Sequence, residues 1–157
     1  MDTVFWTQSI DLGTPGGKML KRLSEILPQD RSYEITVFGS APIQITVDPQ
    51  LLSSDVDLFS SSEDVEHWVR KAGLGMDQAD FFIQVCTELN FRTSPRWKDR
   101  TQSAVIGKCT FKFPHPIDIL IAKLNRLEEK DLQAFRVVIA KTGHPTEAEL
   151  IHELQMA

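Results

Sequence analysis

The sequence lacks the features that mark a secreted or membrane-spanning protein. Its two cysteines, Cys86 and Cys109, stand in apolar contexts with no CxxC pair or neighbouring histidine. Zinc ligation is therefore not expected, and both are interpreted as reduced core thiols of an intracellular protein. No apolar run is as long as a transmembrane helix. The first residues also lack the basic segment and long apolar stretch of a signal peptide. We expect a cytoplasmic protein with no membrane contact.

Positive charge is also scarce. The chain has 17 Lys and Arg against 22 Asp and Glu, a net charge of −5, so its surface as a whole does not attract nucleic acid. The stretch 92–112 is an exception, because it holds six basic residues and one acid, Asp99. Two interpretations stay open: this stretch contacts phosphates, for example of tRNA, or it is an ordinary solvated face.

A length of 157 residues with 41% apolar and 25% charged residues is typical of one soluble domain with a real core. Periodicity predicts a single domain over 1–157, with a sheet-containing core over 1–114 and a helical C-terminal segment over 115–157. Strands followed by helices predict an α/β or α+β layer fold. The predicted strands are 31–38, 55–59, 80–89, 102–106 and 108–113, and the predicted helices are 18–27, 40–47, 63–72, 116–126, 128–142 and 146–155. The helix 40–47 is expected despite its β-branched residues, which favour a strand.

One stretch carries most of the chemistry. An apolar strand stops at Gly39-Ser40, and the next predicted strand carries Asp55 and Asp57. Carboxylates two residues apart on a strand project from the same face, and their repulsion is tolerated best around a divalent cation. A Gly-Ser turn that opens a helix offers backbone N–H groups and a hydroxyl to a phosphate. The alternative is a surface pair of acids at a strand end.

The same residues carry a family resemblance. Gly39-Ser40 followed by Asp55-x-Asp57 resembles the signature of the DNA polymerase beta-like nucleotidyltransferase superfamily. The segment HPIDILIAKLNRLEEKDLQAF, residues 115–135, resembles the C-terminal block of a prokaryotic branch that includes the AbiEii-type toxins of abortive-infection systems. The two blocks occur in the family's order and cover less than a third of the chain. The resemblance implies the nucleotidyltransferase fold, a small mixed sheet flanked by helices.

The resemblance also implies roles for residues at the sheet. Asp55 and Asp57 match a catalytic pair that, with a third acid on an adjacent strand, holds two Mg²⁺ ions around an NTP. Gln84 stands where that third acid is expected, and a neutral amide is a poor substitute for a charged ligand. Glu88, two steps further along the same predicted strand face, becomes the candidate third catalytic acid, provided that a bulge or register shift brings it closer. Asp80 is a weaker candidate.

In the C-terminal block, Lys123 and Asp131 match the family's lysine and first acid, whereas Lys130 replaces an arginine and Ala134 replaces a second acid. Helical spacing places Lys123, Arg126 and Lys130 on one face. The shared face makes Lys123 and Arg126 candidate nucleotide-binding residues beside Gly39 and Ser40, and the resemblance adds Asp131. The alternative is an exposed ladder of ion pairs.

For three further residues, a structural role is the favoured interpretation or no role is expected. Asp118, behind Pro116, is expected to cap a helix rather than bind metal. His115, between two prolines, is expected to be a loop histidine without a role. Trp97 has basic neighbours and could stack on a base, but a loop or core anchor is the favoured interpretation.

The residues indicate a site for a metal–nucleotide complex, and the resemblance implies an Mg²⁺-dependent nucleotidyltransferase that transfers NMP from an NTP to a hydroxyl acceptor, either an RNA such as tRNA or a protein. The resemblance places it in a toxin–antitoxin or phage-defence setting, with a possible antitoxin partner. Gln84 and Ala134 favour a second hypothesis, a catalytically inactive protein of this fold that binds a nucleotide or a protein partner. A plain interaction domain is the third hypothesis, and it would show Asp55 and Asp57 pointing apart into solvent.

Overall fold

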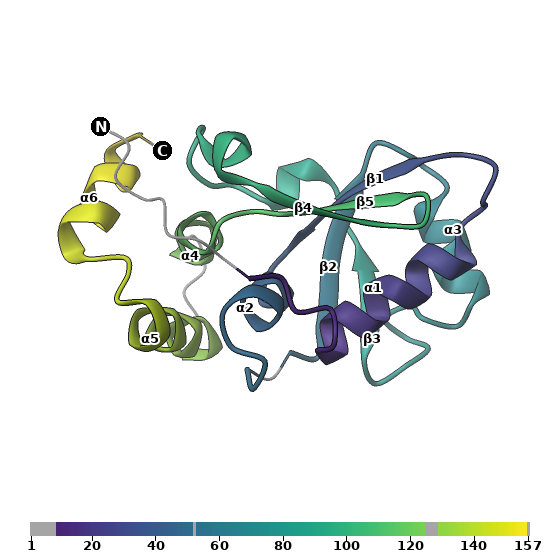
Figure 1. Ribbon diagram of the computed structural model, residues 1–157, viewed down its shortest axis with the longest axis horizontal. Helices are drawn as coiled ribbons and strands as arrows, with labels where there is room; N and C mark the ends of the chain where they lie inside the picture. The colour runs from purple at the N-terminus through teal and green to yellow at the C-terminus, as the bar shows by residue number, and fades with distance from the viewer. Residues whose placement is uncertain (1–8, 52, 125–128, 157) are drawn as a thin grey trace.

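The computed structural model describes residues 9–51, 53–124 and 129–156. They form a five-stranded mixed sheet with strand order β3-β2-β1-β5-β4, surrounded by helices (Figure 1). The α/β class predicted from the sequence is thus confirmed. The strands are β1 (Tyr33–Phe38), β2 (Asp55–Ser60), β3 (Phe82–Val85), β4 (Gln102–Ile106) and β5 (Cys109–Phe113). The α-helices are α1 (Pro15–Ile26), α2 (Ala41–Thr46), α3 (Val65–Lys71), α4 (Pro116–Leu124), α5 (Glu129–Thr142) and α6 (Glu147–Met156), and two 3-10 turns are η1 (Glu88–Asn90) and η2 (Trp97–Arg100).

The register of the sheet decides which side chains share a face. Strand β1 pairs antiparallel with β2, so that Phe38 lies opposite Asp57. Strand β3 runs parallel to β2 and places Gln84 beside Asp57. On the other side of β1, β5 runs parallel to it and forms a hairpin with β4 through Gly107. Since residues in register point to the same side of a sheet, Phe38, Asp57 and Gln84 share one face.

The opposite face of the sheet is the main core. Ile35, Val37 and Leu58 are fully buried there, in one cluster with residues of α1 and α3, among them Leu20, Leu23, Val65 and Val69. A second cluster joins Phe38 and Phe59 to residues of α2, α4 and α5, among them Ile43, Ile119, Leu120 and Val138. Figure 1 shows α5 and α6 at one end of the molecule and α3 at the other. No helix in the described ranges is long and apolar enough to cross a membrane.

The predicted helices are confirmed, including the one that strand propensity disfavoured. Helix α2 forms over Ala41–Thr46 because Ile43 and Ile45 are buried against the core, and tertiary burial outweighs a weak intrinsic preference. Helix α1 begins three residues before the predicted range, since the Thr14 side chain accepts a hydrogen bond from the N–H of Gly17.

Strand β3 is shorter than predicted, and this changes the position of Glu88. The last bond along this strand joins the Cys86 N–H to the Leu58 carbonyl at 2.7 Å. Immediately afterwards the chain turns, because Thr87 and Asn90 form a capping box around η1. The prediction of a strand through residue 89 is therefore wrong, and Glu88 lies in the turn.

Two polar residues near α4 contradict their predicted roles. Asp118 does not cap a helix; it is fully buried and paired with Arg100, whose Nε and Nη2 donate to its two oxygens at 3.0 and 2.6 Å. Arg100 Nη1 also donates to Glu153 of α6 at 2.8 Å. His115 is buried as well, and its Nδ1 accepts the Ile117 N–H at 3.2 Å, so it supports the start of α4. This buried network joins α4, α6 and η2.

Candidate functional site

The two aspartates of β2 lie on the same face of the sheet, as predicted. Asp55 and Asp57 are half-buried. Val56 and Leu58, which alternate with them along the strand, are fully buried on the other face. Period-two alternation along the strand produces this arrangement. The geometry speaks against the third hypothesis, in which the two carboxylates would point apart.

The Gly-Ser turn at the end of β1 meets the Asp57 carboxylate directly. Gly39 has φ of +72°, and a Cβ atom built there would lie 2.5 Å from Asp57 Oδ2. Both the positive φ and the close approach require glycine at this position. The carboxylate therefore lies against the main chain at the point where it turns into α2.

Lys123 reaches the same turn from α4. Its Nζ donates to Ser40 Oγ at 3.0 Å and to Asp131 Oδ1 of α5 at 3.0 Å. Only 4% of the Lys123 side chain is exposed, and that of Asp131 is fully buried. The exposed-ladder interpretation is thus wrong for this lysine. Buried ion pairs hold their groups in fixed positions when the hydrogen bonds are short.

These groups border a small cavity of about 90 Å³. Gly39, Asp57 and Lys123 line it, so the structure brings together residues from both blocks of the family resemblance. Two lining residues, Asn90 and Phe91, were missed by the sequence analysis. The Thr87-to-Asn90 spacing, which is typical of a capping box, could have indicated that this turn folds back toward the site.

Glu88 does not join the two aspartates. Its side chain is 59% exposed and pairs with Lys98 at 3.4 Å, and it lines a different, larger cavity. The residue beside Asp57 is Gln84, which is exposed. Within 9–51, 53–124 and 129–156, no three His, Cys, Asp or Glu side chains are grouped so that they could hold a metal ion. The catalytic role of Glu88 stays a prediction that this geometry does not support.

The pKa of the Cys86 thiol is affected by the two aspartates on this face. Burial raises its pKa to about 11, and the negative charges of Asp57 and Asp55 contribute to the rise. A negative potential at this position is what a site for a divalent cation requires.

Other predicted cationic contacts are distributed differently. Arg126 lies outside the described residues, and Lys130 belongs to α5 rather than to the helix of Lys123. In the basic stretch 92–112, Arg100 is buried in its ion-pair network. Lys98 pairs with Glu88, and Lys112 pairs with Glu34. Arg100, Lys98 and Lys112 are therefore already matched by acids.

Trp97 is an anchor, as the sequence favoured. Its ring meets those of Phe59 and Phe91 edge-on, with centroids 6.4 and 5.2 Å apart. Edge-to-face contacts of this kind stabilise aromatic clusters. One part of the indole remains accessible, because Trp97 also lines the larger cavity.

A family model of nucleotidyltransferases of unknown function (DUF6036) matches residues 18–142, most of the chain. The chain belongs to this family. No curated protein and no solved structure matches the chain significantly. The matched range of this nucleotidyltransferase-family protein contains Gly39, Ser40, Asp55, Asp57, Lys123 and Asp131. The match supports the nucleotidyltransferase part of the resemblance and does not reach as far as the AbiEii-type branch.

Proposed function

We propose that this protein transfers NMP from an NTP to a hydroxyl acceptor, with Mg²⁺ bound by Asp55 and Asp57. One observation carries the proposal: the Asp57 carboxylate lies against Gly39, and Lys123 donates to the adjoining Ser40. A carboxylate pair on β2, a positive-φ glycine and an ammonium group fixed from α4, gathered around one Gly-Ser turn, suit a metal-bound polyphosphate.

The donor set fits one magnesium ion. Mg²⁺ is usually bound through one or two carboxylates and substrate phosphates, with water completing its octahedron. Asp55 and Asp57 supply two carboxylates, and Gln84 adds a neutral amide beside Asp57. The resemblance implies two ions, but the described residues give no third carboxylate. The proposal therefore assigns one ion to the protein's own ligands, and a calorimetric titration with Mg²⁺ and a non-hydrolysable NTP counts the ions bound.

The chain's own groups have distinct roles. Bound Mg²⁺ would supply charge neutralisation on the transferring phosphoryl group. Ser40 and Lys123 would contact the leaving phosphates, and the absence of a Cβ at Gly39 would let phosphate approach the main chain. Asp131 is a positioning residue, because it holds the Lys123 ammonium group beside Ser40.

Label transfer tests the activity. The protein is incubated with each α-³²P-labelled NTP, Mg²⁺ or Mn²⁺, and either total tRNA or total protein. We expect label to move to an acceptor with wild type and not with Asp55→Asn/Asp57→Asn. A matched control, Glu25→Gln/Glu66→Gln, also removes two acids, both exposed and on α1 and α3. Transfer that survives loss of the aspartate pair, or that fails equally in the control, contradicts the proposal.

The resemblance supports a defence setting as part of the same proposal. An AbiEii-type toxin would arrest growth when expressed alone and would be relieved by an antitoxin. Expression from a repressible promoter tests this directly, with Asp55→Asn/Asp57→Asn as the comparison. Growth that is unaffected by wild-type expression would separate the protein from that branch while leaving the transferase proposal intact.

Gln84 favours a second candidate, an inactive protein of this fold that binds a nucleotide. An uncharged side chain beside Asp57 weakens any site that needs three carboxylates. This candidate predicts that NTP with Mg²⁺ raises the melting temperature, because ligands of the native state stabilise it, while wild type transfers no label. Gln84→Asp would then create transfer activity. Turnover by wild type would exclude this candidate.

A further inference from the structure

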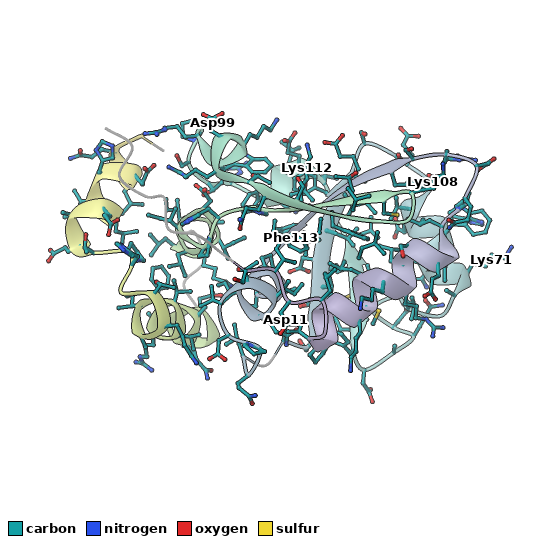
Figure 2. All side chains as sticks on the ribbon, viewed as in Figure 1. Asp11, Lys71, Asp99, Lys108, Lys112 and Phe113 are labelled. Carbon is teal, nitrogen blue, oxygen red and sulfur yellow. The ribbon has the colours of Figure 1, made fainter. Side chains whose placement is uncertain are left out.

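A second, larger cavity lies on the same face of the sheet as the aspartates. Its volume is about 530 Å³, within the range of about 300–1,000 Å³ that is typical of small-molecule sites. Thr36 and Phe59 form its floor on β1 and β2, and Trp97 and Thr87 stand at its side. Figure 2 shows Lys112 of β5, which lines this cavity, on the same side of the β4–β5 hairpin as Asp99 of η2.

The lining of the cavity begins one same-face residue beyond Asp57 on β2, on the side away from the Gly-Ser turn, and does not include Asp57 itself. Phe59 follows Asp57 by two residues on the same face, a step of roughly 6.6 Å along a strand. On the paired strand, Thr36 comes two residues before Phe38, whereas Gly39 comes one residue after it. The Phe38–Asp57 pair therefore separates the phosphate-contacting turn from the larger cavity.

In-line phosphoryl transfer requires this kind of separation. The attacking and leaving oxygens lie on opposite sides of the phosphorus atom. If the leaving phosphates occupy Ser40 and Lys123, the attacking hydroxyl must approach past Asp57 from the opposite direction. The larger cavity lies in that direction along β1 and β2, so it is here named the acceptor cavity.

The lining indicates the chemistry of its occupant. The four charged side chains of the lining form two ion pairs, Lys98 with Glu88 and Lys112 with Glu34. The lining therefore carries no net positive charge that would attract an anion. Hydroxyl side chains add polar contacts, and the rings of Trp97 and Phe59, which meet edge-on, add apolar surface. The hydroxyl residues are Thr36, Ser60, Ser61, Thr87, Thr101 and Ser103.

We propose that the acceptor cavity binds a ribonucleoside and directs one of its ribose hydroxyls toward Asp57. A neutral base with a sugar offers one flat face for the aromatic wall and several hydroxyls for the polar lining. A serine or threonine side chain of a protein acceptor would leave most of the volume empty. The same nucleoside chemistry can come from the 3′ end of an RNA or from a free nucleoside.

The proposed step balances. The ribose oxygen forms a bond to the α-phosphorus of the NTP, and the bond from that phosphorus to the pyrophosphate oxygen breaks. The hydroxyl proton passes to water, and pyrophosphate leaves toward Ser40 and Lys123. This inference rests on the transferase activity proposed above, so its experiment measures acceptor binding separately from NTP binding.

The experiment blocks the cavity from an exposed position. Ser103→Trp fills it from β4, where Ser103 is exposed, and Val105→Trp is the matched control. Val105 is on the same strand face, is 72% exposed and does not line the cavity. The dissociation constants of the four ribonucleosides, and of short RNAs ending in a 3′-hydroxyl or a 3′-phosphate, are measured by calorimetry. We expect the constant of the preferred probe to rise at least tenfold in Ser103→Trp and less than twofold in Val105→Trp.

Each outcome decides a separate point. Tighter binding of the 3′-hydroxyl RNA than of any nucleoside identifies an RNA end as the source, and the reverse identifies a free nucleoside. Equal binding by wild type and Ser103→Trp, or no binding of any probe while NTP still raises the melting temperature, overturns the acceptor cavity alone. If NTP does not raise the melting temperature of wild type, the proposed function is overturned instead. Should Ser103→Trp fail to fold, Ser61→Trp blocks the opposite rim from a second exposed position.

Discussion

Replacing Arg100 by methionine should destabilise the protein far more than its place in a basic loop suggests. The Arg100 side chain is 1% exposed, and those of its partners Asp118 and Glu153 are fully buried. It donates two hydrogen bonds to Asp118, at 3.0 and 2.6 Å, and one to Glu153, at 2.8 Å. Without the guanidinium group, the two buried carboxylates lose the cation that is hydrogen-bonded to both of them.

The magnitude follows from the cost of an uncompensated buried charge. Removing one partner of a buried ion pair costs about 3–5 kcal/mol. For a chain of this size, 1 kcal/mol lowers the melting temperature by about 2–4 °C. We therefore expect Arg100→Met to melt about 6–20 °C below wild type at pH 7. Urea unfolding measures the same difference as a lower midpoint.

The stability difference between Arg100→Met and wild type should depend on pH. Burial raises the pKa of Asp118 although the Arg100 guanidinium opposes the rise. A carboxyl whose folded pKa lies above its unfolded value stabilises the protein fully below the unfolded pKa, and this stabilisation is lost as pH rises through the folded pKa. Loss of Arg100 raises the folded pKa of Asp118 further. The difference in melting temperature between Arg100→Met and wild type should therefore be smaller at pH 4 to 5 than at pH 7.

An exposed pair provides the control. Arg70 pairs with Asp77 at 3.0 Å, but the two side chains are 48% and 68% exposed, so solvent screens the interaction. Arg70→Met should have the same melting temperature as wild type. The reasoning is refuted if Arg100→Met and Arg70→Met melt together, or if the Arg100→Met deficit is as large at pH 4 as at pH 7.

Three further predictions concern the site itself. Gly39→Ala should lose roughly 1–2 kcal/mol through its positive φ and should abolish the NTP·Mg²⁺ melting shift, because its Cβ meets Asp57 Oδ2; a normal shift by fluorimetry would contradict the placement of that carboxylate. Lys123→Met should cost about 3–5 kcal/mol in urea unfolding because it removes one partner of the buried Lys123–Asp131 ion pair, whereas Lys123→Met/Asp131→Leu should recover stability without recovering NTP binding. Cys86, with a pKa raised to about 11, should react slowly with iodoacetamide at pH 8 and faster in Asp55→Asn/Asp57→Asn; equal rates would show that the carboxylates lie too far from the thiol to act on it.

The sequence predicts what depends on local pattern. Alternation along residues 55–59 places the two aspartates on one face because the period of a strand is fixed. The break at Gly39-Ser40 predicts the turn, since glycine adopts the positive φ found there at no steric cost. Helical spacing and the breaks around Gly143 and Pro145 likewise predict the C-terminal helices, which the structure confirms within a few residues at each end.

What the sequence does not predict depends on partners far along the chain. Arg100 reads as one more cation in a basic stretch, because the acids that bury it are 18 and 53 residues away. Helical spacing alone leaves open whether Lys123 belongs to an exposed ladder of ion pairs, because its contact with Ser40 spans 83 residues; the family resemblance is what makes it a candidate for the site. Strand propensity carries β3 past its real end, because no pattern of apolar residues records the hydrogen bonds of the turn at Thr87.

The two buried charge clusters act on the same helix. Helix α4 carries Asp118 in its first turn, tied to Arg100, and Lys123 in its last turn, tied to Ser40 and Asp131. A helix fixed by ion pairs at both ends has little freedom to rotate or slide, because either motion would strand a buried charge. The position of the Lys123 ammonium group at the Gly-Ser turn therefore depends on a cluster that does not line the small cavity. It follows that Arg100→Met, at temperatures where it is still folded, should bind NTP·Mg²⁺ more weakly than wild type, while Arg70→Met should bind it equally well.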